Sequence, residues 1–142
     1  VIPPLRGEAD REALRAAVAD GTLDAICSDH QPHEEDAKTD PFPLTAPGIS
    51  ALETLLPLGL RLVEQKILTP LQLAERVGLA PRRILGAAAT TDETAGYILV
   101  DPAARWQLSP DNLHSRGHNT PFMGEVMPGR VQHVFIAPGT GA

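Results

Sequence analysis

Apolar residues in the first part of the chain recur at helical spacing, and the last part carries short apolar runs. Between residues 10 and 19 the apolar positions fall three or four apart, which predicts a helix that ends at Gly21. Residues 22–28 are short, apolar and compatible with β structure, so they predict a buried strand. A helix, a tight turn and a strand together form half of a βα repeat.

A second helix is predicted after Ser50, which stands three residues before Glu53 as in a capping box. Several leucines from position 52 onward give this helix a wide apolar face. Pro57 lies within the pattern and lacks the N–H that an interior helical position needs. We therefore expect Pro57 to kink the helix.

A third helix is predicted to begin at Thr69, with Pro70 in its first turn and Gln72 completing a second capping box. This helix should end near Gly78. A short fourth helix is expected over 81–85.

The pattern changes after residue 86. The small, polar stretch 87–94 predicts a loop and a domain boundary. Residues 97–100 predict a buried strand that Asp101 and the proline after it should end, and 131–136 alternate like a final strand. Helices therefore precede the boundary and strands follow it.

Length and composition limit the possible architectures and partners. The chain has 142 residues and a mass of 15.1 kDa, whereas a complete (β/α)₈ barrel needs roughly 250 residues. Its net charge of −6 argues against nucleic acid or an anionic membrane as a partner. The single cysteine excludes an intrachain disulfide framework and favours a reducing, cytoplasmic location. The chain does not begin with methionine, so we expect it to be a piece of a longer polypeptide.

The residues that suggest chemistry follow the predicted strand at 22–28. Asp29 comes directly after it, and His30 and His33 come next. In α/β barrels the reacting groups lie at the carboxyl ends of strands, where an aspartate can bind Zn²⁺ or accept a proton from water. The alternative is that Asp29 caps a turn and both histidines are surface residues, because one aspartate provides too few ligands for a zinc site. Cys27 is expected to be a small core residue.

Four ordered motifs extend this pattern over most of the chain. They are Pro-Pro-Leu-Arg at 3–6, Ser-Asp-His-Gln-Pro-His at 28–33, Pro-Gly-Ile-Ser-Ala-Leu-Glu at 47–53 and Asn-Thr-Pro-Phe-Met-Gly at 119–124. Together they resemble the carboxyl-terminal third of a class I dihydroorotase, in the amidohydrolase superfamily.

This resemblance implies an α/β fold made of two parts. Residues 1–90 would form the last repeats of a (β/α)₈ barrel, with 22–28 as its eighth strand. Residues 91–142 would contribute the carboxyl-terminal strands of a small β-sandwich.

The resemblance also implies a reaction, the zinc-dependent, reversible hydrolysis of dihydroorotate to N-carbamoyl-aspartate in pyrimidine biosynthesis. Asp29 would be both a metal ligand and the general base or acid. His33, Pro47 and Gly48 would contact the substrate. The remaining ligands for one or two zinc ions would lie upstream, so we expect the 142-residue chain alone to be inactive.

Two positions depart from the family pattern. Ile2 stands where the family usually has an asparagine that contacts the substrate, and isoleucine cannot form that hydrogen bond. Pro47 replaces a residue whose backbone N–H the family could use. These departures leave two alternatives open: a non-catalytic dihydroorotase-like subunit that supports aspartate carbamoyltransferase, or another cyclic amidohydrolase such as a hydantoinase or allantoinase.

A role in assembly also stays open. The resemblance implies a homo-oligomer, and a leucine-rich helix face could serve as a partner surface. The leucines that would form that face are Leu52, Leu55, Leu56 and Leu60.

Overall fold

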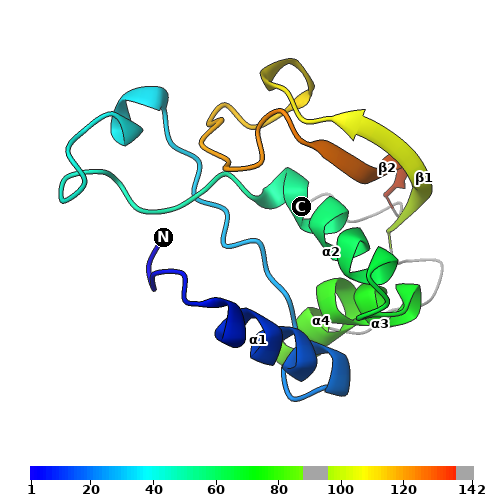
Figure 1. Ribbon diagram of the computed structural model, residues 1–142. Coiled ribbons are helices and arrows are strands. Elements are labelled where there is room, and N and C mark those ends of the chain that lie inside the picture. The colour runs from blue at the N-terminus through cyan, green and yellow to red at the C-terminus, as the bar shows by residue number, and fades with distance from the viewer. Residues whose placement is uncertain (88–95, 137–142) are drawn as a thin grey trace.

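The structure is a computed structural model that describes residues 1–87 and 96–136. Its elements are helices α1 (Glu8–Asp20), α2 (Leu55–Glu64), α3 (Pro70–Ala74) and α4 (Ala80–Ile84), and strands β1 (Tyr97–Gln107) and β2 (Val126–Phe135). Helix α2 packs against both the sheet and α3, while a long loop between α1 and α2 extends to one side (Figure 1). The predicted loop and boundary at 87–94 lie almost entirely outside the described residues.

The first helix forms as predicted, but the strand predicted after it does not. Gly21 ends α1 in the left-handed conformation, at φ 93°. Residues 22–28 contain no strand, and the N–H of Ile26 donates to the carbonyl of Arg76 at 2.9 Å. Extended backbone becomes a strand only beside another strand. Among the described residues none lies next to this segment.

The second helix differs from its prediction at its start. A short 3-10 turn, Leu52–Thr54, leads into α2, so Pro57 falls in the first turn of the α-helix. A first-turn N–H has no intrahelical acceptor, and a proline there removes no helical hydrogen bond. Pro57 therefore does not occupy the interior position on which the predicted kink depended.

The third helix begins as predicted and runs further. The N–H of Gln72 donates to the Thr69 hydroxyl at 3.2 Å, and the N–H of Thr69 donates to the Gln72 side chain at 2.8 Å. These bonds confirm the capping box. Gly78 does not end the helix, because one π-helical turn, Glu75–Leu79, connects α3 to α4.

The two strands form one antiparallel sheet and are both longer than predicted. Asp101 and Pro102 do not end β1. Pairing is irregular between Asp101 and Arg105 and then resumes. The Asp101 carboxylate accepts the N–H of Ala103 at 2.9 Å, which satisfies a backbone donor within the irregular stretch. The prediction that the strand stops at Asp101 is therefore wrong.

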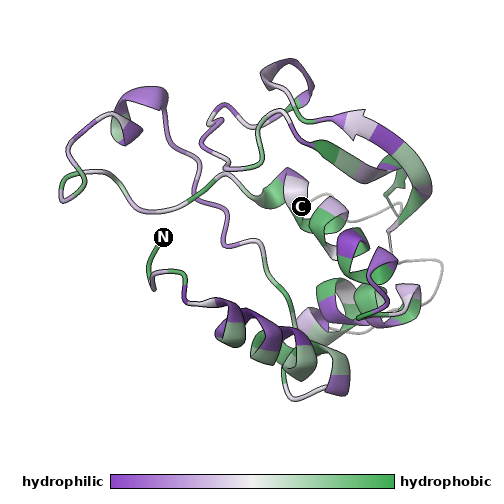
Figure 2. Ribbon diagram, viewed as in Figure 1, coloured by the Kyte–Doolittle hydropathy of each residue, from purple (hydrophilic) through white to green (hydrophobic). Residues whose placement is uncertain are grey.

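The buried core is small and joins the helices to the sheet. Leu60, Leu68 and Leu73 form its centre, and Val18 of α1 and Val100 of β1 pack against it. Many large apolar side chains nevertheless remain exposed. They include apolar residues in the first half of β1 and in β2, which Figure 2 shows in green. No helix in the described part of the chain is both long enough and apolar enough to cross a membrane.

Candidate functional site

Asp29 directly follows residues 22–28, where the predicted strand does not form. Its φ of 43° is in the left-handed region, which aspartate tolerates better than most residues. The side chain is exposed, and its Oδ1 accepts a hydrogen bond from the amide of Gln31 at 3.1 Å. Such backbone strain often occurs at functional positions, so the conformation of Asp29 supports a functional hypothesis.

His30, the next residue, contacts the backbone just before α2. Its ring Nδ1 accepts the backbone N–H groups of Ala51 and Leu52, each at 3.0 Å. His30 thus satisfies backbone donors that precede the helix, a role that the sequence assigned to Ser50 and Glu53. An accepting Nδ1 carries no proton, so the ring is the neutral Nε2–H tautomer in this arrangement.

The predicted capping box of Ser50 and Glu53 is wrong, because the Glu53 carboxylate bonds to His114 and Ser115 instead. The backbone N–H and ring Nδ1 of His114 donate to Oε1 of Glu53 at 2.7 and 2.9 Å, and the N–H of Ser115 donates to Oε2 at 3.1 Å. Burial acts to raise the pKa of Glu53, but these hydrogen bonds outweigh it and hold the pKa below its ordinary value.

The predicted substrate residues lie together on two neighbouring loop segments. The Nε2–H of His33 donates to the carbonyl of Pro47 at 2.9 Å. The N–H of Gln31 donates to the carbonyl of Ile49 at 2.8 Å, which makes a single parallel bridge between the segments. The structure therefore brings His33, Pro47 and Gly48 into one place. Their contact with a substrate stays a prediction.

Gly48 is the buried residue at the centre of this arrangement. Its φ is 111°, and a Cβ at this position would lie 2.5 Å from both Cβ and Oε1 of Gln31. The Gly48 carbonyl accepts from Nζ of Lys38 at 2.8 Å and from Nδ2 of Asn119 at 3.3 Å. Glycine is thus required here by both its backbone conformation and its close contact.

Two of these contacting residues were not predicted as part of the site. Lys38 also donates to the carbonyl of Ala46, and Asn119 contacts both loop segments. Asn119 was noted only as part of the motif at 119–124. A cavity of about 500 Å³ adjoins this region, and its lining includes His33, Lys38 and Asn119.

The metal-binding capacity of the described residues is limited. They contain no group of three or more histidine, cysteine, aspartate or glutamate side chains that could hold an ion. The Nδ1 of His30 and the Nε2 of His33 are both occupied by hydrogen bonds. Cys27 is exposed, which corrects the expectation of a core residue, because without the predicted strand it is not enclosed by a sheet. Asp29 is thus the candidate ligand, through a carboxylate that fits one position of a zinc site.

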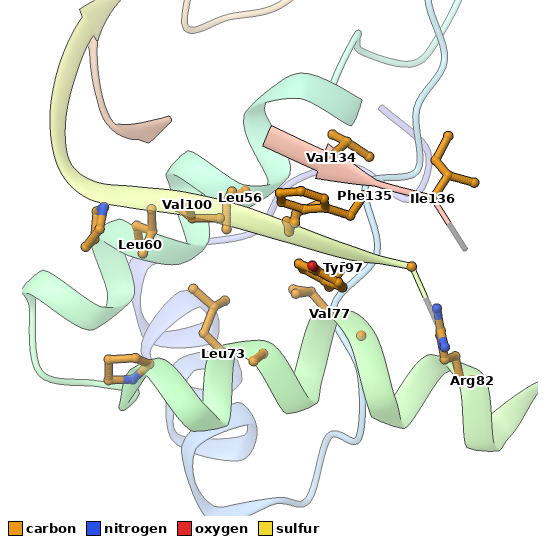
Figure 3. Close-up of a pocket in the computed structure, with 16 residues that line it drawn as sticks. Leu56, Leu60, Leu73, Val77, Arg82, Tyr97, Val100, Val134, Phe135 and Ile136 are labelled. Atoms are coloured by element: carbon orange, nitrogen blue, oxygen red, sulfur yellow. The ribbon is translucent and has the colours of Figure 1, made fainter. Parts of the chain in front are cut away.

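A second cavity, of about 730 Å³, lies away from these residues. It is lined by residues of the helices from α2 to α4 and of the sheet, and its walls are mostly apolar (Figure 3). The rings of Tyr97 and Phe135 stack at its edge with centroids 4.5 Å apart. None of the predicted site residues lines it. The cavity is therefore separate from the candidate site.

Comparison with known proteins gives close sequence relatives. The chain is 44% identical over 139 residues to a dihydroorotase-like protein of Pseudomonas aeruginosa, covering 96% of this chain and 33% of the relative. It is also 44% identical over 138 residues to a dihydroorotase of Pelobacter propionicus, covering 95% and 32%. The chain thus spans about a third of the length of the curated relatives it matches. No protein-family model matches it.

Solved structures show the fold. The crystal structure of dihydropyrimidinase from Brevibacillus agri superposes with a TM-score of 0.83 at 22% identity, covering 96% of this chain and 32% of that one. An inactive dihydroorotase-like domain of a Chaetomium thermophilum CAD-like multifunctional protein gives 0.68 at 20% identity, covering 93% and 35%. The likeness shows that the fold is shared, and the helices and antiparallel sheet of the described residues confirm the α/β class at this coarse level. Over nearly its whole length the chain is therefore similar to the carboxyl-terminal third of proteins named dihydroorotase or dihydroorotase-like.

Proposed function

We propose that this chain is the carboxyl-terminal third of a zinc-dependent dihydroorotase, which hydrolyses dihydroorotate reversibly to N-carbamoyl-aspartate. The observation that carries the proposal is the joining of segments 29–33 and 47–49 into one site, in a chain 44% identical to a dihydroorotase. In this proposal, residues 1–90 complete a (β/α)₈ barrel and 91–142 complete a β-sandwich. The extensive exposed apolar surface supports this, because large apolar patches are usually covered.

Asp29 is the proposed catalytic residue and metal ligand. One or two zinc ions, held mainly by residues outside this chain, would lower the pKa of the attacking water towards neutrality. The exposed Asp29 carboxylate accepts that water's proton and passes it to the ring nitrogen that leaves. The hydrogen bond from Gln31 restrains Asp29 through Oδ1.

The two loop segments supply substrate contacts. Dihydroorotate carries a carboxylate, which suits recognition by hydrogen-bond donors. The Nε2 of His33 is used by Pro47, so the opposite edge of the ring faces the substrate in this proposal. Pro47 has no N–H, and the backbone donor of this segment is therefore the N–H of Gly48.

A non-catalytic subunit that supports aspartate carbamoyltransferase is the second candidate. Two observations favour it: a close relative is named dihydroorotase-like, and Ile2 occupies the position of the family's asparagine. Ile2 is 73% exposed and cannot replace that side chain's hydrogen bond. A partner subunit, or a second copy in a homo-oligomer, would then cover part of the exposed apolar surface. A hydantoinase or allantoinase has weaker support, because the solved hydantoinases match at 20–25% identity and show the fold alone.

The deciding experiment is dihydroorotate hydrolysis by the full-length cytoplasmic polypeptide that carries this chain, purified with zinc. We expect turnover that a chelator abolishes and added zinc restores. Hydantoin and allantoin serve as competing substrates, and preference for either one would replace dihydroorotase with that activity. A folded, zinc-supplied protein without turnover would instead support the non-catalytic subunit, which co-purification with aspartate carbamoyltransferase then tests.

A further inference from the structure

Asn119 holds together the two loop segments that carry the candidate site. Its Oδ1 accepts the backbone N–H of His33 at 2.7 Å. Its Nδ2 donates to the carbonyls of Gln31 and Gly48, at 3.1 and 3.3 Å. One side chain from near the end of the chain therefore bonds to both segments at once.

The backbone around Asn119 adds to this connection. The carbonyl of Asn119 accepts the N–H of Ser50 at 3.2 Å. Two residues earlier, buried Gly117 lies so close to the first segment that a Cβ there would be 2.6 Å from the nitrogen of His33. Residues 117–119 thus form a surface against which both segments are placed.

The chemistry of the contacts requires an amide. An asparagine side chain has an acceptor oxygen and a donor NH₂, and here the oxygen meets an N–H while the nitrogen meets two carbonyls. A carboxylate would keep the first bond but would place negative charge against two carbonyl oxygens. An alanine would leave all three backbone groups without this partner.

We propose that Asn119 is a positioning residue that fixes the geometry of the substrate-binding segments. This inference rests on the proposed function for its catalytic consequence. The ring of His33 contacts Pro47, and the backbone of His33 is held by Asn119. Loss of the Asn119 side chain frees both segments to shift, and the substrate contacts of His33 and Gly48 weaken.

The test compares Asn119→Ala and Asn119→Asp with Asn112→Ala in the full-length polypeptide. Asn112 is a matched control because its amide also bonds to backbone, accepting from Ser109 at 3.0 Å and donating to Gln107 at 2.6 Å, and neither partner belongs to the two loop segments. We expect KM for dihydroorotate to rise about tenfold in both Asn119 variants, with a smaller change in kcat, as for lost binding contacts. Asn112→Ala should keep the wild-type KM. If Asn119→Ala does not fold, the near-isosteric Asn119→Asp carries the test.

Amide hydrogen exchange provides a readout that does not need turnover. The N–H of His33 should exchange at least tenfold faster in Asn119→Ala than in wild type or Asn112→Ala, because only the alanine variant loses its acceptor. Unchanged exchange overturns the proposal, as does wild-type KM in a folded, active Asn119 variant or an equal rise in KM in Asn112→Ala. If wild type shows no turnover, the proposed function fails, whereas faster exchange confined to the two segments still supports the positioning role.

Discussion

Glu53 and His114 are joined by two hydrogen bonds across 61 residues of sequence, from both the backbone and the ring of the histidine to one carboxylate oxygen. The second carboxylate oxygen accepts the N–H of Ser115. The Glu53 side chain is only 22% exposed, whereas the His114 side chain is almost fully exposed. The carboxylate therefore ties the segment after β1 to the start of α2.

This arrangement predicts a dependence of stability on pH. The folded pKa of Glu53 lies below its ordinary value of 4.5, so the folded state favours the ionised carboxylate. Its stabilisation is complete at pH values above 4.5 and is lost as the pH falls through the folded pKa. Urea unfolding between pH 3 and 7 measures the free energy of unfolding of wild type and of Glu53→Gln. In wild type this free energy should fall below about pH 4.5, and in Glu53→Gln the fall should be smaller by the contribution of Glu53.

At pH 7 the same variant should be less stable by about 1–3 kcal/mol, because a neutral amide accepts more weakly and brings an NH₂ next to backbone donors. Glu125→Gln is the control, since the carboxylate of Glu125 is more exposed and pairs with Arg61 at the surface. An unchanged acid profile in Glu53→Gln would contradict the assigned role.

His30 should contribute to stability through its acceptance of two backbone N–H groups. We expect His30→Ala to lower the free energy of unfolding by about 1 kcal/mol, as does loss of a helix cap. Urea unfolding at pH 7.5 measures this difference. His118→Ala, at an exposed histidine, is the control and should change stability little. Equal stability of the two variants would mean that water replaces His30 as the acceptor.

Gly48 and Gly78 form a matched pair for testing the loop geometry. Gly48→Ala places a Cβ 2.5 Å from Gln31 at a positive φ, so we expect a loss of more than 1 kcal/mol in the free energy of unfolding. A Cβ at Gly78 meets nothing within 4 Å, and Gly78→Ala should be neutral or stabilise by about 0.4–1 kcal/mol. Thermal unfolding of both variants decides this, and a tolerated Gly48→Ala would contradict the tight contact with Gln31.

Local signals in the sequence predict some elements of this fold well. The capping box of Thr69 and Gln72 forms because both partners lie within one helical turn and face no closer competitor. The same spacing at Ser50 and Glu53 gives no such bond. Glu53 bonds to His114 instead, and the Ser50 hydroxyl lies 3.4 Å from that of Ser115. A distant partner thus replaces the local one, and periodicity does not reveal it.

In the candidate site, too, local motifs could be predicted from the sequence and distant contacts could not. The motif at 28–33 identifies Asp29 and His33 as candidates because a carboxylate and histidines follow a predicted strand. That strand does not form in the described residues. The motif at 119–124 includes Asn119 but does not reveal its partners, because 86 residues separate Asn119 from His33. Tertiary packing alone brings it to the loops.

Asp29 is the residue on which the catalytic proposal depends most directly. In the full-length polypeptide, Asp29→Asn should lower kcat for dihydroorotate hydrolysis by at least 100-fold, because an amide cannot accept the proton that the reaction must move. Asparagine also tolerates the φ of 43°, so the local backbone conformation should survive the substitution. Asp24→Asn, at an exposed aspartate in the preceding segment, is the control and should keep wild-type turnover. Both kcat and zinc content are measured for each variant. Loss of both zinc and turnover points to the ligand role of Asp29. Loss of turnover with zinc retained points to proton transfer. Wild-type kcat in a folded Asp29→Asn would remove Asp29 from the mechanism.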